Sequence, residues 1–195
     1  VHDLMKELRK IVDEYEDRVL VGETDDIRFY GSGDDELHLA FNFPLMQADG
    51  ALTPAWIRAN QKKRLSSLPP QAWPCNTLGN HDNARVYSRY GEGKGQPHPH
   101  DAARARLSLA LMLTLRGTPF LYNGEEIGMT DFYLSDPALF RDNTSTMAYP
   151  LLINLVGKSP EEALKMAAMY GRDKCRTPMQ WTHAPNGGFC PAEVT

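Results

Sequence analysis

The chain has 195 residues, of which 42% are hydrophobic, 21 are basic and 25 are acidic, giving a formal net charge of -4 at pH 7. This length and composition favour a globular polypeptide with its own core, and the slight acidity excludes a broad basic surface, so no nucleic-acid partner is expected. No apolar run reaches the roughly 20 residues needed to cross a bilayer, so no membrane partner is expected either.

The N-terminal part of the sequence predicts one helix and two strands. Apolar residues recur at helical spacing over residues 2–17, with charged residues between them, which indicates an amphipathic surface helix. Residues 18–22 form a short β-branched run, typical of a strand buried on both faces, and Glu23 follows its C-terminal end. Apolar residues then alternate with other residues over 37–43, which predicts a second strand that Pro44 ends.

The next segment predicts a helix followed by a third strand. Thr53 is a suitable N-cap and Pro54 suits the first helical position, so we expect a helix that runs through Leu68. A strand fits residues 72–78, and it leads directly into a turn that carries Asn80, His81 and Asp82.

A second helix and strand are expected after a turn-rich loop over residues 90–99. Asp101 can cap a helix over 101–116, and Gly117 supplies a C-terminal stop. Residues 119–122 are the fourth strand candidate. The helical and strand patterns weaken after this point.

The C-terminal part contains one clear helix signal. Ser159 and Glu162 form a capping box, which predicts a short helix that ends near Gly171. The tail over residues 172–195 is rich in proline and glycine and is expected to be loop.

Strands that alternate with helices indicate parallel β-α-β units. A (β/α)8 barrel uses eight strands and about 250 residues, so four strands correspond to roughly half of one. The predicted fold class is therefore α/β, as a partial (β/α)8 barrel.

Two carboxylates, Glu23 and Asp82, follow predicted strands, and ligands bind at this edge of parallel α/β sheets. An acid beside an apolar strand can be desolvated, which suits a proton donor. Either carboxylate could instead cap the turn that follows its strand. The neighbouring His81 favours a functional role for Asp82.

Several motifs together resemble the α-amylase superfamily of glycoside hydrolases, glycoside hydrolase family 13. The first four are VGE at residues 21–23, LHLAFNF at 37–43, LGNHDNAR at 78–85 and GTPFLYNGEEIGM at 117–129. The fifth, RTPMQW at 176–181, is similar to a signature of the α-glucosidase and oligo-1,6-glucosidase branch. The resemblance covers almost the whole chain.

The resemblance implies a retaining glycosidase in which this chain holds barrel strands five to eight. By position in the motifs, Glu23 matches the general acid/base, and Asp82 matches the carboxylate that grips hydroxyls of the sugar that is cleaved. His81 matches its sugar-binding neighbour, Arg85 matches an arginine near the non-reducing end, and Asn80 belongs to the same substrate-binding segment. The implied partner is an oligosaccharide, and neither a metal nor another cofactor is implied.

The chemistry supports this division of roles. Cleaving an acetal with retention needs an acid to protonate the leaving oxygen and a carboxylate to attack the anomeric carbon, about 5 to 5.5 Å apart. Hydrogen bonds to ring hydroxyls that tighten as the sugar flattens add transition-state stabilisation, the role expected of Asp82 and His81.

The sequence departs from the family pattern in important places. The nucleophilic aspartate of strand four, the motifs of strands one and three and a C-terminal β domain have no counterpart in residues 1–195, and Thr182 follows the RTPMQW motif where most relatives have Asp. We therefore expect residues 1–195 to be the C-terminal half of a catalytic barrel, inactive alone and completed by a longer parent or a complementing half. A half barrel exposes apolar faces, so self-association is also expected.

Other polar clusters have ordinary interpretations. His98, His100 and Asp101 are close in sequence, but the intervening proline and a helix-capping role for Asp101 argue against a metal site. Glu125 and Glu126 could reach the site or could be solvated loop charges. The three cysteines of the chain are expected to be free thiols.

Three functions remain open from the sequence. The leading one is hydrolysis of short α-linked glucosides. The second is transglycosylation or isomerisation by the same site, in which an acceptor sugar replaces water. The third is a non-catalytic amylase-like accessory protein, against which the presence of both Glu23 and Asp82 argues.

Overall fold

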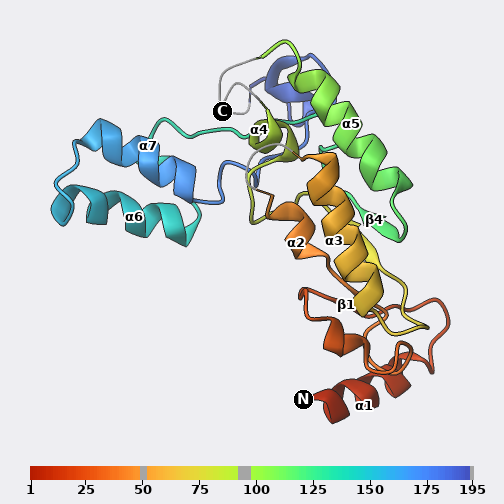
Figure 1. The fold of residues 1–195 in the computed structure, drawn as a ribbon. Coiled ribbons are helices and arrows are strands. Elements are labelled where there is room, and N and C mark those ends of the chain that lie inside the picture. The colour runs from red at the N-terminus through yellow and green to blue at the C-terminus, as the bar shows by residue number, and fades with distance from the viewer. Residues whose placement is uncertain (49–51, 92–97, 194–195) are drawn as a thin grey trace. The chain divides into compact units, whose positions relative to one another are not determined.

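The computed structural model describes residues 1–48, 52–91 and 98–193 of the chain (Figure 1). It divides into two compact units: Val1–Leu78 with Leu107–Leu121, and Gly79–Arg106 with Tyr122–Thr195. Among the described residues, no helix is both long enough and apolar enough to span a membrane.

The first unit contains short parallel strands and the helices that follow them. Its elements are α1 (His2–Val12), β1 (Val21–Gly22), η1 (Ile27–Tyr30), β2 (Leu39–Ala40), α2 (Phe43–Met46), α3 (Pro54–Ser67), β3 (Cys75–Thr77) and β4 (Thr118–Phe120). Helix α5 (Asp101–Thr114) begins in the second unit and ends in the first. The second unit also contains α4 (Val86–Tyr90), η2 (Pro137–Leu139), α6 (Asn143–Asn154), α7 (Pro160–Tyr170) and η3 (Pro185–Gly188).

The four expected strands are present as two parallel pairs, β1 with β2 and β3 with β4. Val21 pairs with Leu39, and Cys75 pairs with Thr118. The parallel direction is as the alternating helices and strands predict. Each strand is shorter than its sequence pattern indicated, because only two or three residues of each apolar run pair in register with a neighbouring strand.

The expectation that the first strand is buried on both faces is wrong. Val19 is 65% exposed and Val21 is 38% exposed. The side chains of a strand point to the two faces of its sheet, so these exposed fractions mean that no described residues fully cover Val19 and Val21. A β-branched run therefore marks the position of this strand but not its burial.

Helix boundaries were predicted well where a cap defines them. The Thr53 hydroxyl accepts from the Trp56 N–H at 3.2 Å, and Pro54 begins α3, which ends one residue before the expected Leu68. Ser159 and Glu162 form the expected capping box of α7, with Gly171 as its C-cap.

Other helix predictions need correction. The first helix ends at Val12 and not at the expected residue 17. Asp17 itself has a left-handed φ of 57°, which does not belong to an α-helix. Pro44 was expected only to end a strand, but it lies in the first turn of α2. Its missing N–H costs no intrahelical hydrogen bond at that position. Tyr90 belongs to α4 instead of the expected loop, whose residues 92–97 lie outside the described residues.

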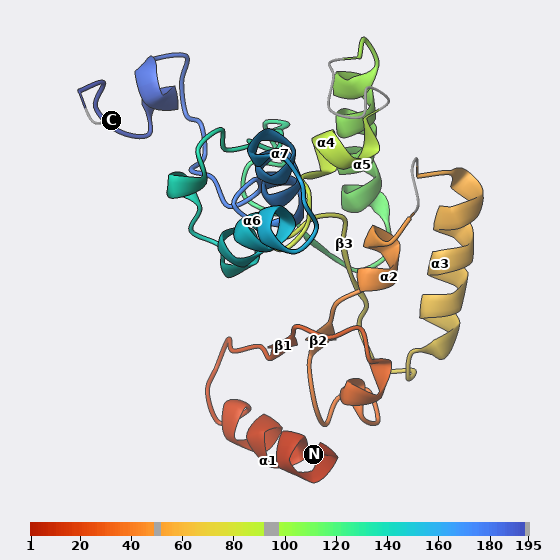
Figure 2. The same cartoon turned by 90° about the vertical axis from the view of Figure 1, so that its left-hand side faces the viewer.

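The structure also contains α6, which the sequence pattern did not reveal. Helices α6 and α7 lie side by side in both views (Figures 1 and 2). Phe140, Ala167 and Ala168 form the buried cluster of this helix pair, and Tyr149 and Leu152 of α6 pack against it. Packing against α7 thus stabilises a helix whose own sequence has no charged polar face.

A buried amide network holds the first unit together between its strands. The Asn76 Oδ1 atom accepts from Asn42 Nδ2 at 3.0 Å and from Gln61 Nε2 at 2.9 Å. The Asn76 Nδ2 atom donates to the main-chain oxygen of Arg116 at 3.0 Å. Asn42 and Asn76 are both almost fully buried, so these hydrogen bonds satisfy polar groups that water does not reach.

Candidate functional site

Glu23 follows β1 in the first unit, and its side chain is exposed. The preceding Gly22 packs closely against Leu37, since a Cβ atom at residue 22 would lie 2.4 Å from Leu37 Cδ1. Glycine therefore allows β1 to lie against the segment that leads into β2. His81 and Asp82 belong to the second unit.

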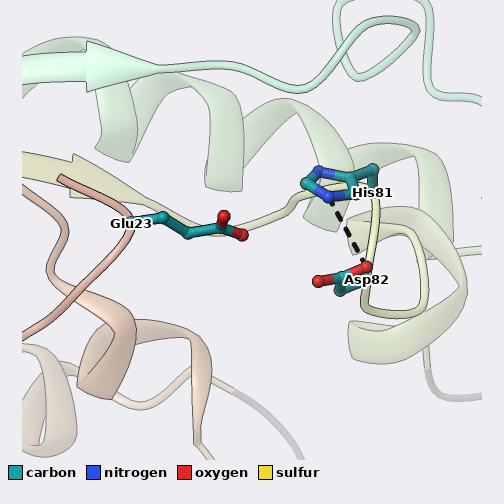
Figure 3. A group of neighbouring side chains, drawn as sticks. All are labelled: Glu23, His81 and Asp82. Atoms are coloured by element: carbon teal, nitrogen blue, oxygen red, sulfur yellow. Dashed lines mark ion pairs between the residues drawn. The ribbon is translucent and has the colours of Figure 1, made fainter. Parts of the chain in front are cut away.

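Asn80 organises the turn that carries His81 and Asp82. Its Oδ1 atom accepts from the Asp82 N–H at 3.0 Å and from Asn83 Nδ2 at 2.8 Å. This is a turn in which a side chain replaces a main-chain acceptor, a common use of asparagine. His81 Nε2 lies 3.5 Å from Asp82 Oδ1, and Figure 3 marks this pair with a dashed line.

Two arginines bind the carboxylate of Asp82. Arg176 Nη2 donates to Asp82 Oδ1 at 2.5 Å, and Arg172 Nη1 donates to the same oxygen at 3.1 Å. Desolvation alone would raise the pKa of Asp82, but the hydrogen bonds from Arg176 and Arg172 outweigh it and hold that pKa below its ordinary value. Asp82 is therefore an ionised hydrogen-bond acceptor at neutral pH rather than a proton donor.

The contacts of Asp82 are concentrated on one of its oxygens. Arg172, Arg176 and His81 all approach Oδ1. The Oδ2 atom accepts no hydrogen bond from any of the described residues. Since the side chain is 36% exposed, Oδ2 is available to a ligand.

Arg172 is itself held by a second carboxylate. Its Nε atom donates to Asp142 Oδ1 at 2.8 Å, and its main-chain N–H donates to Asp142 Oδ2 at 3.1 Å. The Asp142 side chain is only 2% exposed, and it occupies the N-cap position of α6 without capping that helix by a side-chain hydrogen bond. Both of its oxygens are instead directed to Arg172.

Arg85 lies buried behind this turn. Its guanidinium donates to the main-chain oxygens of Asn123 at 2.9 Å and Cys175 at 3.0 Å, and it stacks 4.9 Å from the centre of the Tyr122 ring. Its main-chain N–H donates to Asp131 Oδ1 at 2.8 Å. These contacts connect the segment after β3 to the loop after β4 and to the RTPMQW segment.

Glu125 and Glu126 differ sharply in environment. Glu126 is exposed, whereas burial raises the pKa of Glu125 to about 7. The Glu125 Oε2 atom accepts from the Tyr122 N–H at 3.2 Å, while its buried Oε1 atom has no hydrogen-bond partner. A Cβ atom at Gly79 would lie 1.9 Å from that oxygen, so a larger residue at the start of the turn would displace the Glu125 carboxyl group.

The sequence cluster of His98, His100 and Asp101 has local hydrogen bonds. Asp101 Oδ2 accepts from the His98 N–H at 2.9 Å, and the His100 N–H lies 3.3 Å from His98 Nδ1. Asp101 is the first residue of α5. In neither unit by itself, over its described residues, do three side chains of His, Cys, Asp or Glu lie close enough together to bind one metal ion.

Residues 1–194 match the family model described as the α-amylase catalytic domain. The chain belongs to this family. An oligo-1,6-glucosidase of Parageobacillus thermoglucosidasius is 31% identical over 206 residues, which cover 97% of this chain and 36% of that protein. An α-glucosidase of Pediococcus pentosaceus is 32% identical over 210 residues, which cover 98% of this chain and 37% of that protein.

A solved structure of the same family agrees with these relatives. The trehalulose synthase from Pseudomonas mesoacidophila MX-45 is similar with a TM-score of 0.77 and 31% identity, over 96% of this chain and 36% of that one. Together the relatives place this α-amylase family chain in the α-glucosidase branch of glycoside hydrolase family 13. The chain spans about a third of the length of the relatives that it matches.

The sequence analysis of this α-amylase family chain missed two residues around Asp82. Arg176 opens the RTPMQW motif, so the motif could have directed attention to it. Arg172 carries no such signal, because its contact with Asp82 joins segments 90 residues apart. The sequence left the environment of Glu125 open, because no local pattern reports burial.

Proposed function

We propose that this chain forms strands five to eight of a (β/α)8 barrel, the C-terminal half of the catalytic domain of a retaining α-glycoside hydrolase. The substrates are short α-linked gluco-oligosaccharides. The family match over residues 1–194 and the two parallel strand pairs support this proposal. The relatives named oligo-1,6-glucosidase and α-glucosidase support the substrate class.

The observation that carries the proposal is the state of Asp82. Its carboxylate is held ionised by Arg172 and Arg176, and its Oδ2 atom is left open to a ligand. A charged acceptor with one free oxygen suits a sugar hydroxyl, and such bonds strengthen as the ring approaches the oxocarbenium-like transition state. Asp82 and His81 bind the sugar in this proposal.

Glu23 is the general acid/base. It stands at the C-terminal end of a parallel strand, where ligands bind in barrels of this kind. Asn80 and Arg85 support the sugar-binding residues of this segment. Asn80 holds the turn, and the buried Arg85 connects the surrounding loops.

Methyl α-D-glucopyranoside titrated into the chain, with NMR detection, tests the sugar subsite. We expect shift changes at His81 and Asp82 that disappear in Asp82→Asn. Asp136→Asn is the matched control, since Asp136 is an exposed cap of η2 remote in sequence from the turn. Shift changes that persist unaltered in Asp82→Asn would contradict the proposed subsite.

Residues 1–195 alone do not turn over glycosides, because no nucleophilic aspartate of the strand-four type is present in this sequence. Assays with maltose, isomaltose and an aryl α-glucoside should show no hydrolysis. Adding a segment that carries strands one to four should restore it, and Glu23→Gln should abolish the restored activity while the exposed Glu16→Gln does not. Turnover by the isolated chain that Glu23→Gln removes would refute the proposed division of roles.

A transferase or isomerase is the second candidate, because the chain resembles a trehalulose synthase in sequence and fold. In that case an acceptor sugar would compete with water for the glycosyl-enzyme intermediate. Product analysis of the completed enzyme at high substrate concentration separates the two outcomes, since a hydrolase yields free glucose and a transferase yields a rearranged or longer saccharide.

Self-association of the isolated chain is part of the proposal. Leu4, Leu8 and Ile11 lie one helical turn apart on α1 and are 67%, 40% and 54% exposed. Such a stripe is stabilised by packing against another apolar surface. Sedimentation should detect dimers or larger species, and their weakening in Leu8→Lys should identify the stripe; a monomer at all concentrations would count against this part.

A further inference from the structure

Asp142 is separated from the proposed sugar site by one side chain. Its carboxylate binds the Arg172 guanidinium through Nε at 2.8 Å and Nη2 at 2.7 Å. The same guanidinium then reaches Asp82 Oδ1 through Nη1 at 3.1 Å. One planar cation therefore joins a buried carboxylate to an exposed one.

The geometry makes this connection directional. A guanidinium is rigid and planar, so fixing its Nε and Nη2 atoms also fixes the position of Nη1. Asp142 is almost completely buried, whereas Asp82 is 36% exposed and its Oδ2 atom faces no described donor. The buried carboxylate is thus the anchor, and the exposed carboxylate is the group that is held.

The anchor is itself attached at the base of the α6–α7 helix pair. The main-chain N–H of Asp142 donates to both oxygens of Asp173, at 3.0 and 3.1 Å, and the N–H of Arg141 donates to Asp173 at 3.1 Å. The start of α6 and the end of α7 are thereby joined next to Arg172. This fixes Asp142 before any ligand is present.

We propose that Asp142 is a positioning residue for substrate binding: through Arg172 it holds Oδ1 of Asp82, so that Oδ2 is presented to a sugar hydroxyl. The inference rests on the proposed function of Asp82. Without Asp142 the Arg172 guanidinium has no fixed orientation, so Oδ1 of Asp82 keeps its contacts with Arg176 and His81 but loses an oriented Arg172, and the Asp82 side chain is held less firmly. An acceptor that must be ordered on binding costs affinity, which pre-organisation avoids.

The test uses the whole chain and two readouts, the χ1 couplings of Asp82 and its affinity for methyl α-D-glucopyranoside, both by NMR. Asp142→Asn should broaden the χ1 distribution of Asp82, which Arg176 still holds in part, and weaken binding about tenfold, as the loss of one oriented hydrogen bond to a charged group does. In an Arg172→Gln background, Asp142→Asn should have less than about a twofold further effect, because the connection is already broken. Asp136→Asn should change neither readout.

The outcomes separate the possibilities. If Asp142 has only a structural role, Asp142→Asn should lower stability and leave the χ1 distribution of Asp82 unchanged, or it should weaken sugar binding equally in the wild-type and Arg172→Gln backgrounds. Either result overturns the proposal. If Asp142→Asn does not fold, Arg172→Lys serves instead, since an ammonium cannot span both carboxylates as the guanidinium does, and the χ1 distribution of Asp82 should again broaden. A wild-type chain that binds no sugar would remove the proposed function, while the χ1 couplings would still decide whether Asp142 orders Asp82.

Discussion

The guanidinium of Arg176 lies directly against the carboxylate of Asp82, with Nη2 and Oδ1 2.5 Å apart. The Nε atom of Arg176 also donates to the main-chain oxygen of His81 at 3.0 Å. One side chain of the C-terminal loop therefore holds both the backbone and the charge of the turn after β3. The motif that indicates the glucosidase branch and the turn that carries Asp82 form one structural element.

Arg176→Gln should raise the pKa of Asp82 toward its ordinary value of about 3.9. The pKa of Asp82 is depressed, so its contribution to stability is present above that ordinary value and is lost as the pH falls through the folded-state pKa. Carboxyl-carbon NMR titration measures the change. Solvent screens this pair, since Asp82 is 36% exposed, so the effect on unfolding should be small.

Arg28→Gln provides a control for that titration. Hydrogen bonds from Arg28 lower the pKa of Asp26 to about 2. This variant should raise the pKa of Asp26 and leave that of Asp82 unchanged. An Asp82 midpoint that is the same with and without Arg176 would show that other groups hold its charge.

Glu125→Gln should remove a pH dependence of stability. Burial raises the pKa of Glu125 from 4.5 to about 7, so between these values the folded chain keeps a proton that the unfolded chain has lost. Stability therefore falls as the pH rises through this window, by roughly 3 kcal/mol in total. Urea unfolding at pH 4.5 and pH 8 measures it.

The matched control is Glu126→Gln, which changes the exposed neighbour. It should leave the pH dependence of unfolding as in the wild type. The free energy of unfolding of Glu125→Gln, relative to that of the wild type, should increase as the pH rises. If the two free energies of unfolding differed by the same amount at every pH between 4.5 and about 7, Glu125 would already be ionised in the folded chain at acidic pH.

Asn76→Ala should destabilise the chain by about 3 kcal/mol, because it removes the partner of the buried Asn42 amide, of the half-buried Gln61 amide and of the main-chain oxygen of Arg116. Urea denaturation with an unchanged m-value checks this. Asn83→Ala is the comparison, since Asn83 donates only in an exposed turn, and it should cost far less. A loss below about 0.5 kcal/mol for Asn76→Ala would mean that water enters the network.

Ser159→Ala should destabilise α7 by about 1 kcal/mol, since the Ser159 hydroxyl accepts from the Glu162 N–H in the capping box. Hydrogen exchange of the first-turn amides of α7 should accelerate accordingly. Ser66→Ala is a suitable control, because the Ser66 hydroxyl only donates to a main-chain oxygen within α3. Equal protection of α7 in wild type and Ser159→Ala would show that packing alone fixes this helix end.

Sequence reasoning succeeded where a few adjacent residues determine the structure. The caps at Thr53 and Ser159 are local, so the starts of α3 and α7 were predicted correctly. Helix α6 was missed because its stability comes from α7, and its interior Pro150 argues against a helix when the sequence is read alone. The strands were placed correctly but too long, since pairing depends on distant partners.

The candidate site shows the same division. Glu23, His81 and Asp82 were found because each follows a strand pattern within a family motif. The charges that control Asp82 were not, because Arg172 comes from a segment 90 residues away. Glu125 and Glu126 are adjacent identical residues, and only the fold, which partly buries Glu125 and leaves Glu126 exposed, distinguishes them.

The connection between Asp142 and Arg172 also determines where this part of the chain can vary in length. The two ends of the α6–α7 pair are joined at its base, by Asp142 and Asp173. The opposite end turns at Gly157, where an added Cβ would have nothing within 4 Å. Residues inserted at that turn would lengthen the helix pair outward and leave the orientation of Asp82 unchanged, so the tip can diverge among relatives while the base is retained.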